Sequence, residues 1–262
     1  MGGGGALAGG PGPATLGIML IALFTDFGWE GPYVGQVHAV LAAAAPGVPV
    51  VDLMHDAPLC APRPAACLLA AVVAPLPREA VVVGVVDPGV GNPRRLPVVL
   101  EADGRWYVGP GNGLFSLVAR QAQRARWHVI TWRPERLSSS FHGRDLFAPV
   151  AARIAREGHP GDWVQAQSPA DPGARWPQDL WEVIYVDRFG NLVTGVRAQA
   201  LASARRLQVA GVEVAHAETF SAVPEGEVFW YANSMGLVEI ACNRASAGDR
   251  LGAGPGTPVT PA

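Results

Sequence analysis

The chain has 262 residues, of which 49% are hydrophobic and 16% are charged, and its formal net charge at pH 7 is −2. Because an average soluble domain has about 25% charged residues, this low charged fraction predicts large cores or a buried subunit interface. The near-neutral charge and the scattered Lys and Arg residues exclude the clustered basic surface that nucleic-acid binding requires.

The cysteines and the apolar runs predict the cellular compartment. Cys60, Cys67 and Cys242 form neither an even set nor a CxxC pair, which is typical of a reducing compartment, so we expect a cytoplasmic protein. No apolar run reaches the roughly 18 residues of a membrane span. The N-terminal segment also lacks the basic start of a signal peptide, so we expect no membrane partner.

The first part of the chain reads as an α/β domain. Residues 1–18 are rich in Gly, Pro and Ala and are predicted to be a disordered tail, with Met19 as an alternative start. Strands are predicted at 19–25, 48–53, 80–86, 98–102, 106–108 and 127–131, and helices at 34–45, 64–73, 114–121 and 145–157. Asp145 is expected to cap the last helix. This alternation predicts an α/β sheet domain over 19–160, with helices on both faces of the sheet.

A change of composition marks the end of this domain. Residues 161–180 are rich in Pro, Gly, Asp and Gln without periodicity, and are predicted to be a linker. Beyond them, strands are predicted at 181–186, 207–214, 228–231 and 237–241. Gly, Asn and Ser turns separate these strands, so a second, smaller β domain is predicted over 181–262.

The loops that follow strands are the candidate sites, because ligands of open α/β sheets bind beyond the carboxyl ends of the strands. The polar loops are TDFG at 25–28, DPGVGNPRR at 87–95, PGNG at 110–113, FHGRD at 141–145, DRFGN at 187–191 and NSMG at 233–236. Taken alone, each has an ordinary explanation: Asp26 could cap a helix, Asp87 could form a turn, and His142 could simply be packed. Arg94 and Arg95 could be a solvated charge pair.

Several site classes lack their sequence signature. The histidines other than His142 share neither an i,i+4 pair nor an HExxH spacing, so no metal site is predicted. They are His38, His55, His128, His159 and His216. The serines at 138–140 lack the GxSxG elbow of serine hydrolases. Neither a GxxxxGK[ST] loop nor a GxGxxG loop after the first strand is present, so no nucleotide-phosphate cradle is expected.

Six segments, taken together and in order, carry a family resemblance. They are TDFG (25–28), GPYVGQ (31–36), VDPGVGNPRR (86–95), SSSFHGRDLFAPVAA (138–152), YVDRFGNLVT (185–194) and NSMGLVEIACNRASA (233–247). This set resembles the signature of the S-adenosylmethionine hydroxide adenosyltransferases, relatives of the bacterial fluorinases and chlorinases, and covers residues 19–262. The resemblance implies an α/β domain followed by a small β-barrel-like domain, assembled as a homotrimer with active sites between neighbouring subunits. It implies hydrolysis of S-adenosylmethionine to adenosine and L-methionine.

The resemblance places the water-activating residues of the family on Asp87, Arg94 and His142. Neutral water is a poor nucleophile because its pKa is about 15.7, so a base must help it attack the ribose C5′. His142 can take the proton, Arg94 can pair with Asp87, and Asp87 can orient the imidazole or the water. No metal and no cofactor are implied, because S-adenosylmethionine is the substrate.

Substrate-binding residues follow from the same resemblance. It implies that Asp26 accepts hydrogen bonds from both ribose hydroxyls and that Asp187 meets the methionine ammonium group. Asn191 is implied to read the adenine edge with one donor and one acceptor. Ser234 and the backbone of Met235 are implied to bind the methionine carboxylate.

Phe141 is implied to pack on the ligand, and two positions depart from the family pattern. Gly111 stands where relatives commonly have Asp, which weakens the expectation that Asn112 contacts the ligand. Met235 stands where fluorinases have Arg, which leaves the methionine carboxylate to main-chain donors.

Three other functions remain open from the sequence. A halide-dependent adenosyltransferase would need an anion pocket without a base, and Asp87, Arg94 and His142 argue against it. A non-catalytic protein that binds S-adenosylmethionine or adenosine would keep the same binding residues. A metal-dependent phosphohydrolase would use Asp26, Asp56, Asp87 and His142, and chelation would inactivate it.

Overall fold

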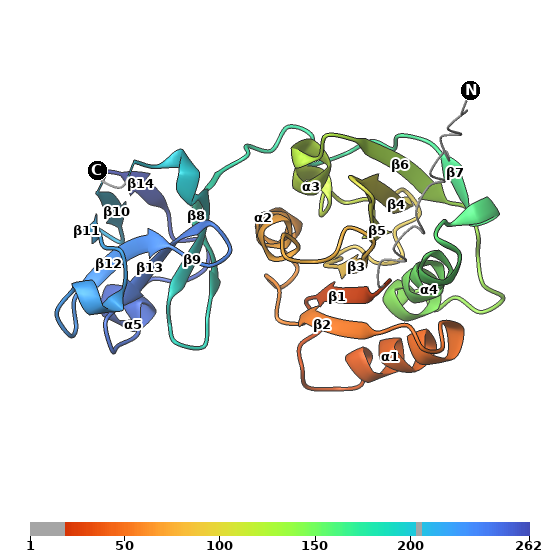
Figure 1. Cartoon of the computed structure of the whole chain (residues 1–262), viewed down its shortest axis with the longest axis horizontal. Helices are drawn as coiled ribbons and strands as arrows, with labels where there is room; N and C mark the ends of the chain where they lie inside the picture. The colour runs from red at the N-terminus through yellow and green to blue at the C-terminus, as the bar shows by residue number, and fades with distance from the viewer. Residues whose placement is uncertain (1–18, 203–205) are drawn as a thin grey trace, which may run out of the picture.

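The protein consists of two sheet-based bodies connected by a long segment (Figure 1). The structure, a computed structural model, describes residues 19–202 and 206–262. The predicted disordered tail, residues 1–18, lies outside the described residues. No helix within the described residues is long and apolar enough to cross a membrane.

The first body follows the predicted strand and helix pattern, with ends that differ by up to three residues. Its elements are β1 (Ile21–Thr25), α1 (Tyr33–Ala44), β2 (Val50–Met54), α2 (Pro62–Val72), β3 (Val81–Val85), β4 (Pro97–Ala102), β5 (Arg105–Pro110), α3 (Ser116–Gln121), β6 (Ala125–Ile130), a π-helix (Gly143–Phe147), α4 (Ala148–Glu157), a 3-10 helix (Gly161–Trp163) and β7 (Val164–Ala166). Strand β7 lies within the segment predicted as a linker and pairs with β6.

The first sheet has helices on both faces, as predicted (Figure 1). Its strand order is β2-β1-β3-β5-β4-β6-β7. Strands β1, β2, β3 and β5 are parallel, and β4, β6 and β7 extend the sheet in antiparallel pairs. In β1, Ile21 and Leu23 pack toward α1 and α4, while Ala22 and Phe24 pack toward α2 and α3. The strand is therefore buried on both faces, which explains its unbroken apolar run.

The prediction that Asp145 caps the last helix is wrong. The chain is already helical from Gly143, in a π-helix that runs directly into α4. The carboxylate of Asp145 instead accepts hydrogen bonds from the backbone N–H of Ser138 (2.8 Å) and from Nε of Arg144 (2.6 Å). Asp145 therefore ties the preceding loop to the helix, and π-helical turns of this kind are frequent at functional sites.

The second body is a nearly closed, barrel-like sheet, as the family resemblance implied. Its elements are β8 (Leu180–Val186), β9 (Leu192–Arg197), a 3-10 helix (Ala198–Ala200), β10 (Leu207–Val209), β11 (Val212–His216), a 3-10 helix (Phe220–Ala222), β12 (Val228–Ala232), β13 (Leu237–Cys242), α5 (Ala247–Leu251) and β14 (Val259–Pro261). The strand order is β14-β10-β11-β12-β13-β9-β8. The chain before β14 returns to β8, because Val183 donates to Thr257 O (2.9 Å) and Gly256 donates to Val183 O (2.8 Å).

The single strand predicted at 207–214 is in fact a hairpin of β10 and β11. Ala210 and Gly211 connect the two strands with positive φ angles of 49° and 79°. Two successive residues with positive φ are typical of the tight two-residue turn of a β-hairpin. The sequence pattern missed this turn because alanine rarely adopts that conformation.

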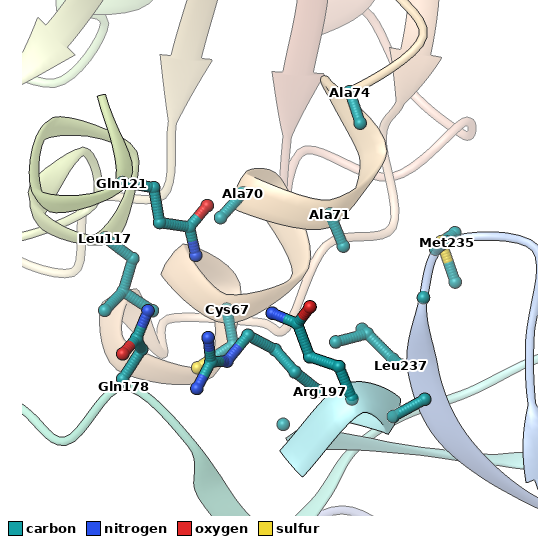
Figure 2. Close-up of a pocket in the computed structure, with 14 residues that line it drawn as sticks. Cys67, Ala70, Ala71, Ala74, Leu117, Gln121, Gln178, Arg197, Met235 and Leu237 are labelled. Carbon is teal, nitrogen blue, oxygen red and sulfur yellow. The ribbon is translucent and has the colours of Figure 1, made fainter. Parts of the chain in front are cut away.

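The two bodies meet where α2 packs on β8 and β9. The Tyr185 hydroxyl donates to the Asp56 carboxylate (2.8 Å) across this contact. Beside it lies a cavity of about 300 Å³ between α2, α3 and the second sheet (Figure 2). In Figure 2, Ala71 of α2 and Met235 of the second body line this cavity. Burial alone would raise the pKa of Asp179, but the hydrogen bonds from Arg197 at 2.7 and 2.8 Å outweigh this effect, so the pKa lies below its usual value.

Candidate active site

Three loops meet at the carboxyl edge of the first sheet. Strand β1 leads into Asp26, β3 leads into Asp87, and β5 leads into Asn112. The backbone N–H of Asp26 donates to Val85 O (3.3 Å), and the side-chain amide of Asn112 donates to Val86 O (2.7 Å). Asn112 is therefore buried and supports the backbone. The loops lie where open α/β sheets bind their ligands.

Asp26 is a partly buried carboxylate fixed by one backbone donor. Its Oδ2 accepts a hydrogen bond from the N–H of Cys60 (2.9 Å). Burial raises the pKa of Asp26 above its usual value, the Cys60 hydrogen bond opposes that shift, and the negative charge of Asp87 adds to it. The two carboxylates therefore influence each other electrostatically across the sheet edge.

Asp87 and His142 share a cavity of about 370 Å³, which Arg95 and Ser139 also line. The Asp87 side chain is only 7% exposed, and its Oδ1 accepts hydrogen bonds from the Gly89 N–H (3.1 Å) and from the Arg95 guanidinium. The arginine on Asp87 is therefore Arg95. Arg94, for which the resemblance implied this pairing, is exposed, and its backbone N–H donates to Asn92 Oδ1 (3.0 Å).

Gly91 allows the Asp87 loop to approach the His142 loop. Its φ is +81°, and a Cβ at this position would lie 2.6 Å from the backbone oxygen of Ser139. Any other residue would both strain the backbone and push the two loops apart. The shared cavity of Asp87 and His142 thus depends on this close contact.

An aromatic cluster joins the Asp26 loop to the His142 loop. The Phe141 ring packs edge-on against Phe27 (centroids 5.6 Å apart) and Tyr33 (5.3 Å). Phe141 is 9% exposed, whereas Tyr33 and the nearby Trp29 are 50% and 61% exposed. Phe141 therefore connects the two loops, and the exposed rings beside it have surface available for contact.

The remaining predicted residues lie in the second body, around a cavity of about 870 Å³ lined by Asp187, Asn191, Ser234 and Met235. Asp187 Oδ1 accepts hydrogen bonds from the N–H groups of Phe189 (2.8 Å) and Asn191 (2.9 Å). Its Oδ2 accepts a hydrogen bond from the Asn191 side-chain amide (2.9 Å). Asp187 and Asn191 thus form one locked turn.

Comparison with known families covers nearly all of both bodies. Residues 21–163 match the SAM hydroxide adenosyltransferase N-terminal domain, and residues 181–260 match the C-terminal domain of the same family, where SAM is S-adenosylmethionine. The chain belongs to the S-adenosylmethionine hydroxide adenosyltransferase family. The N-terminal match ends just before β7, and the C-terminal match spans β8 to β14.

Individual relatives are similar to this chain along almost their whole length. A Thermus thermophilus protein named (R)-S-adenosyl-L-methionine hydrolase is 42% identical over 257 residues, which are 91% of this chain and 98% of the relative. A Salinispora arenicola protein of the same name is 39% identical over 254 residues, with 90% and 95% covered. An uncharacterized conserved protein from Thermotoga maritima has a similar crystal structure, with a TM-score of 0.82, 29% identity, and 92% and 98% covered.

The adenosyltransferase motif NSMGLVEIA contains a buried network that sequence reasoning missed. Glu239 is 5% exposed and accepts hydrogen bonds from the Tyr231 hydroxyl (2.6 Å) and the Asn233 amide (2.8 Å). Asn233 Oδ1 in turn accepts from the backbone N–H of Met235 (3.0 Å). Burial and the Glu239 hydrogen bond raise the pKa of Tyr231. A single acid in the apolar run of β13 was the available signal, because such an acid requires buried partners.

Within one chain, the candidate residues of the first and second bodies line separate cavities, although Asp26 and Phe141 line neither of the two. The lining residues around Asp87 and His142 all fall within 87–147, and those around Asn191 all fall within 185–246. Neither cavity has a lining residue from the other body. Each cavity therefore holds part of the residue set that the family resemblance implies.

Proposed function

We propose that this chain hydrolyses S-adenosylmethionine to adenosine and L-methionine, by attack of water at the ribose C5′. The observation that carries this proposal is the cavity at the sheet edge in which Asp87 and His142 lie together. Membership of the family, and the hydrolase name of relatives up to 42% identical, support the same reaction.

The proposed mechanism needs one base and an oriented water. His142 takes a proton from the water as its oxygen bonds to C5′, the C5′–S bond breaks, and methionine leaves as a neutral thioether. Asp87 orients the imidazole or the water. The Gly89 N–H and the Arg95 guanidinium hold the Asp87 carboxylate in place. We propose no metal and no cofactor for this step.

The proposed substrate contacts use both bodies. Asp26 accepts hydrogen bonds from the ribose hydroxyls, and Asn191 reads the adenine edge. Ser234 and the Met235 backbone bind the methionine carboxylate, with the Met235 N–H shared between the carboxylate and Asn233 Oδ1, to which it donates at 3.0 Å. Asp187 already accepts three hydrogen bonds from its own turn, so it acts on the methionine ammonium group through its charge. Phe141 contributes by holding the Asp26 and His142 loops together.

We further propose a homotrimer in which the first body of one subunit and the second body of its neighbour complete each site. Two features support this arrangement: the separate cavities of the single chain, and large exposed apolar side chains beside each of them. Leu96 and Leu137 line the cavity of Asp87 and His142 and are each 36% exposed, and Phe189 lines the cavity around Asn191 and is 78% exposed. Such side chains are typical of surfaces that become buried on association.

The three cysteines are free, which supports our assignment to the cytoplasm.

Hydrolysis in oxygen-18 water tests the reaction. We expect S-adenosylmethionine to yield adenosine that carries oxygen-18 in its 5′ hydroxyl, because the new C5′–O bond comes from solvent, and mass spectrometry measures the label. Binding without any product would support the non-catalytic alternative. A halogenated adenosine formed in the presence of chloride would support the halide-dependent alternative.

A double-mutant cycle tests the arginine assignments. Because Arg95 contacts Asp87, we expect the loss of kcat in Arg95→Ala to disappear largely in an Asp87→Asn background. Arg94→Ala serves as the matched control, and its effect should add in full to that of Asp87→Asn. Coupling of Asp87 to Arg94 in place of Arg95 would return the pairing role to Arg94.

A further inference from the structure

Two histidines and one aspartate lie together beside β2, the outermost strand of the first sheet. His38 lies on α1, Asp52 lies on β2, and His55 directly follows β2. Nε2 of His38 lies 2.7 Å from Asp52 Oδ1, and Nε2 of His55 lies 2.9 Å from the same oxygen. Among the residues that the structure describes, these three form the group whose ligand atoms all lie within 4.8 Å of one another.

We propose that His38, Asp52 and His55 bind one divalent transition-metal ion, for which Zn²⁺ is the fitting probe. Two imidazole nitrogens and one carboxylate oxygen are ligands that Zn²⁺ prefers, with a water in the fourth position. Ligand atoms about 2.1 Å from a tetrahedral ion lie roughly 3.4 Å apart. The observed separations of 2.7 and 2.9 Å therefore need to widen only slightly to admit the ion.

The surroundings of His55 match those of a metal-binding histidine. Its side chain is 1% exposed, and its Nδ1 lies 2.7 Å from the Thr25 hydroxyl, in a buried hydrogen bond. Histidines that bind metals through one nitrogen commonly hold the other in such an outer hydrogen bond, which fixes the ring. The hydroxyl can accept from Nδ1–H when the metal takes Nε2.

The site also has an entrance and a negative charge. The side chains of His38 and Asp52 are 35% and 28% exposed, so an ion and its water can reach the cluster from the solvent side. Asp52 supplies a carboxylate within hydrogen-bond distance of both Nε2 atoms. Charge and access thus both favour a cation.

The metal site is separate from the adenosyl chemistry but adjoins its scaffold. His55 O accepts a hydrogen bond from the Gly28 N–H (2.6 Å), and Thr25 O accepts one from the Ala57 N–H (3.1 Å). Bound metal would therefore brace the 25–28 loop that carries Asp26. The four residues of the phosphohydrolase alternative, which include Asp26 and Asp87, form no such ligand group within the described residues.

Metal titration of the untagged full chain tests this site. After treatment with EDTA and dialysis, we expect calorimetry with Zn²⁺ to show one ion per chain, and Co²⁺ to give the visible absorption of a site with nitrogen ligands. His38→Ala and Asp52→Asn should each weaken Zn²⁺ binding at least tenfold, which is the scale for losing even an outer partner. Zn²⁺ at about ten times the Kd of the parent should raise the Tm of the parent clearly and that of His38→Ala much less.

Two control variants separate this site from adventitious binding. His159→Ala removes an exposed histidine outside the cluster, and Cys60→Ser removes an exposed thiol, and both should bind Zn²⁺ like the parent. No binding to the parent, or equal affinity in His38→Ala, would overturn the proposal. These readouts need no turnover, so they stand or fall independently of the proposed hydrolysis.

Discussion

Replacing His142 by glutamine should lower the turnover of S-adenosylmethionine by roughly 100-fold or more while changing its affinity only a few fold. Glutamine keeps a hydrogen-bonding side chain of similar reach but cannot take a proton from water. The base acts only as the C5′–O bond forms, so its loss affects kcat and leaves ground-state binding nearly intact. Single-turnover kinetics and calorimetric affinity measure the two effects separately.

Asp87→Asn should cause a loss of kcat of the same order. The asparagine keeps the shape of the side chain but removes the charge that the Arg95 guanidinium contacts, so the imidazole or the water loses its orienting group. Because the Asp87 side chain is only 7% exposed, the Tm of the variant must be compared with that of the parent. His159→Gln is the matched control for both variants. Near-normal turnover in either variant with a parental Tm would remove that residue from the mechanism.

Hydrophobic patterning predicted most of the first body because its central strands β1 and β3 are buried on both faces and its helices carry apolar stripes. Strand β7 is not predicted because its three residues, Val164–Ala166, are too few to show the alternation of apolar and polar side chains typical of a strand. Strand β9 is not predicted because Leu192–Arg197 directly follows the Asp187 turn, where the sequence indicates a loop motif. Short strands are recognised through their pairing partners, which sequence spacing alone does not reveal.

The site shows a similar division between what sequence can and cannot predict. Polar residues that follow parallel strands meet at one end of the sheet, so their position after strands makes the Asp26 and Asp87 loops candidates, and the family resemblance supplies their implied roles. The choice between Arg94 and Arg95 depends on which way each side chain leaves the loop. Both arginines follow Asn92: its side chain accepts from the Arg94 N–H, and its backbone oxygen accepts from the Arg95 N–H. Only the folded turn sends Arg95 to Asp87.

The histidine cluster was invisible for a related reason. His38 and Asp52 are separated by 14 positions and lie on different elements, so no local spacing rule links them. Helix α1 and strand β2 bring them together at the sheet edge, where His55 follows three residues after Asp52. Metal motifs read from sequence detect ligands on one helix or one loop, and this group has neither arrangement.

Mixed trimers of two inactive variants should regain activity. In the proposed trimer, Asp87 belongs to one subunit of each site and Asn191 belongs to its neighbour. An Asp87→Ala chain and an Asn191→Ala chain, each nearly inactive alone, should on co-expression restore about a quarter of the sites, because an intact site needs one specific variant on each side of a cyclic interface. Turnover per subunit, relative to the parent protein, measures this fraction.

Two affinity tags sharpen this measurement. The Asp87→Ala chain carries one tag and the Asn191→Ala chain carries the other, so tandem purification keeps only mixed trimers. In a closed ring of three subunits that contains both variants, about one site of three is intact. The Tm of each single variant must match that of the unmodified protein, because Asn191 is 5% exposed and its amide donates a hydrogen bond to Asp187. Mixed trimers as inactive as their parents would place the complete site within a single chain. The first and second bodies of one chain would then have to close on each other around S-adenosylmethionine, and the separation of their cavities in the free chain would mark an open state.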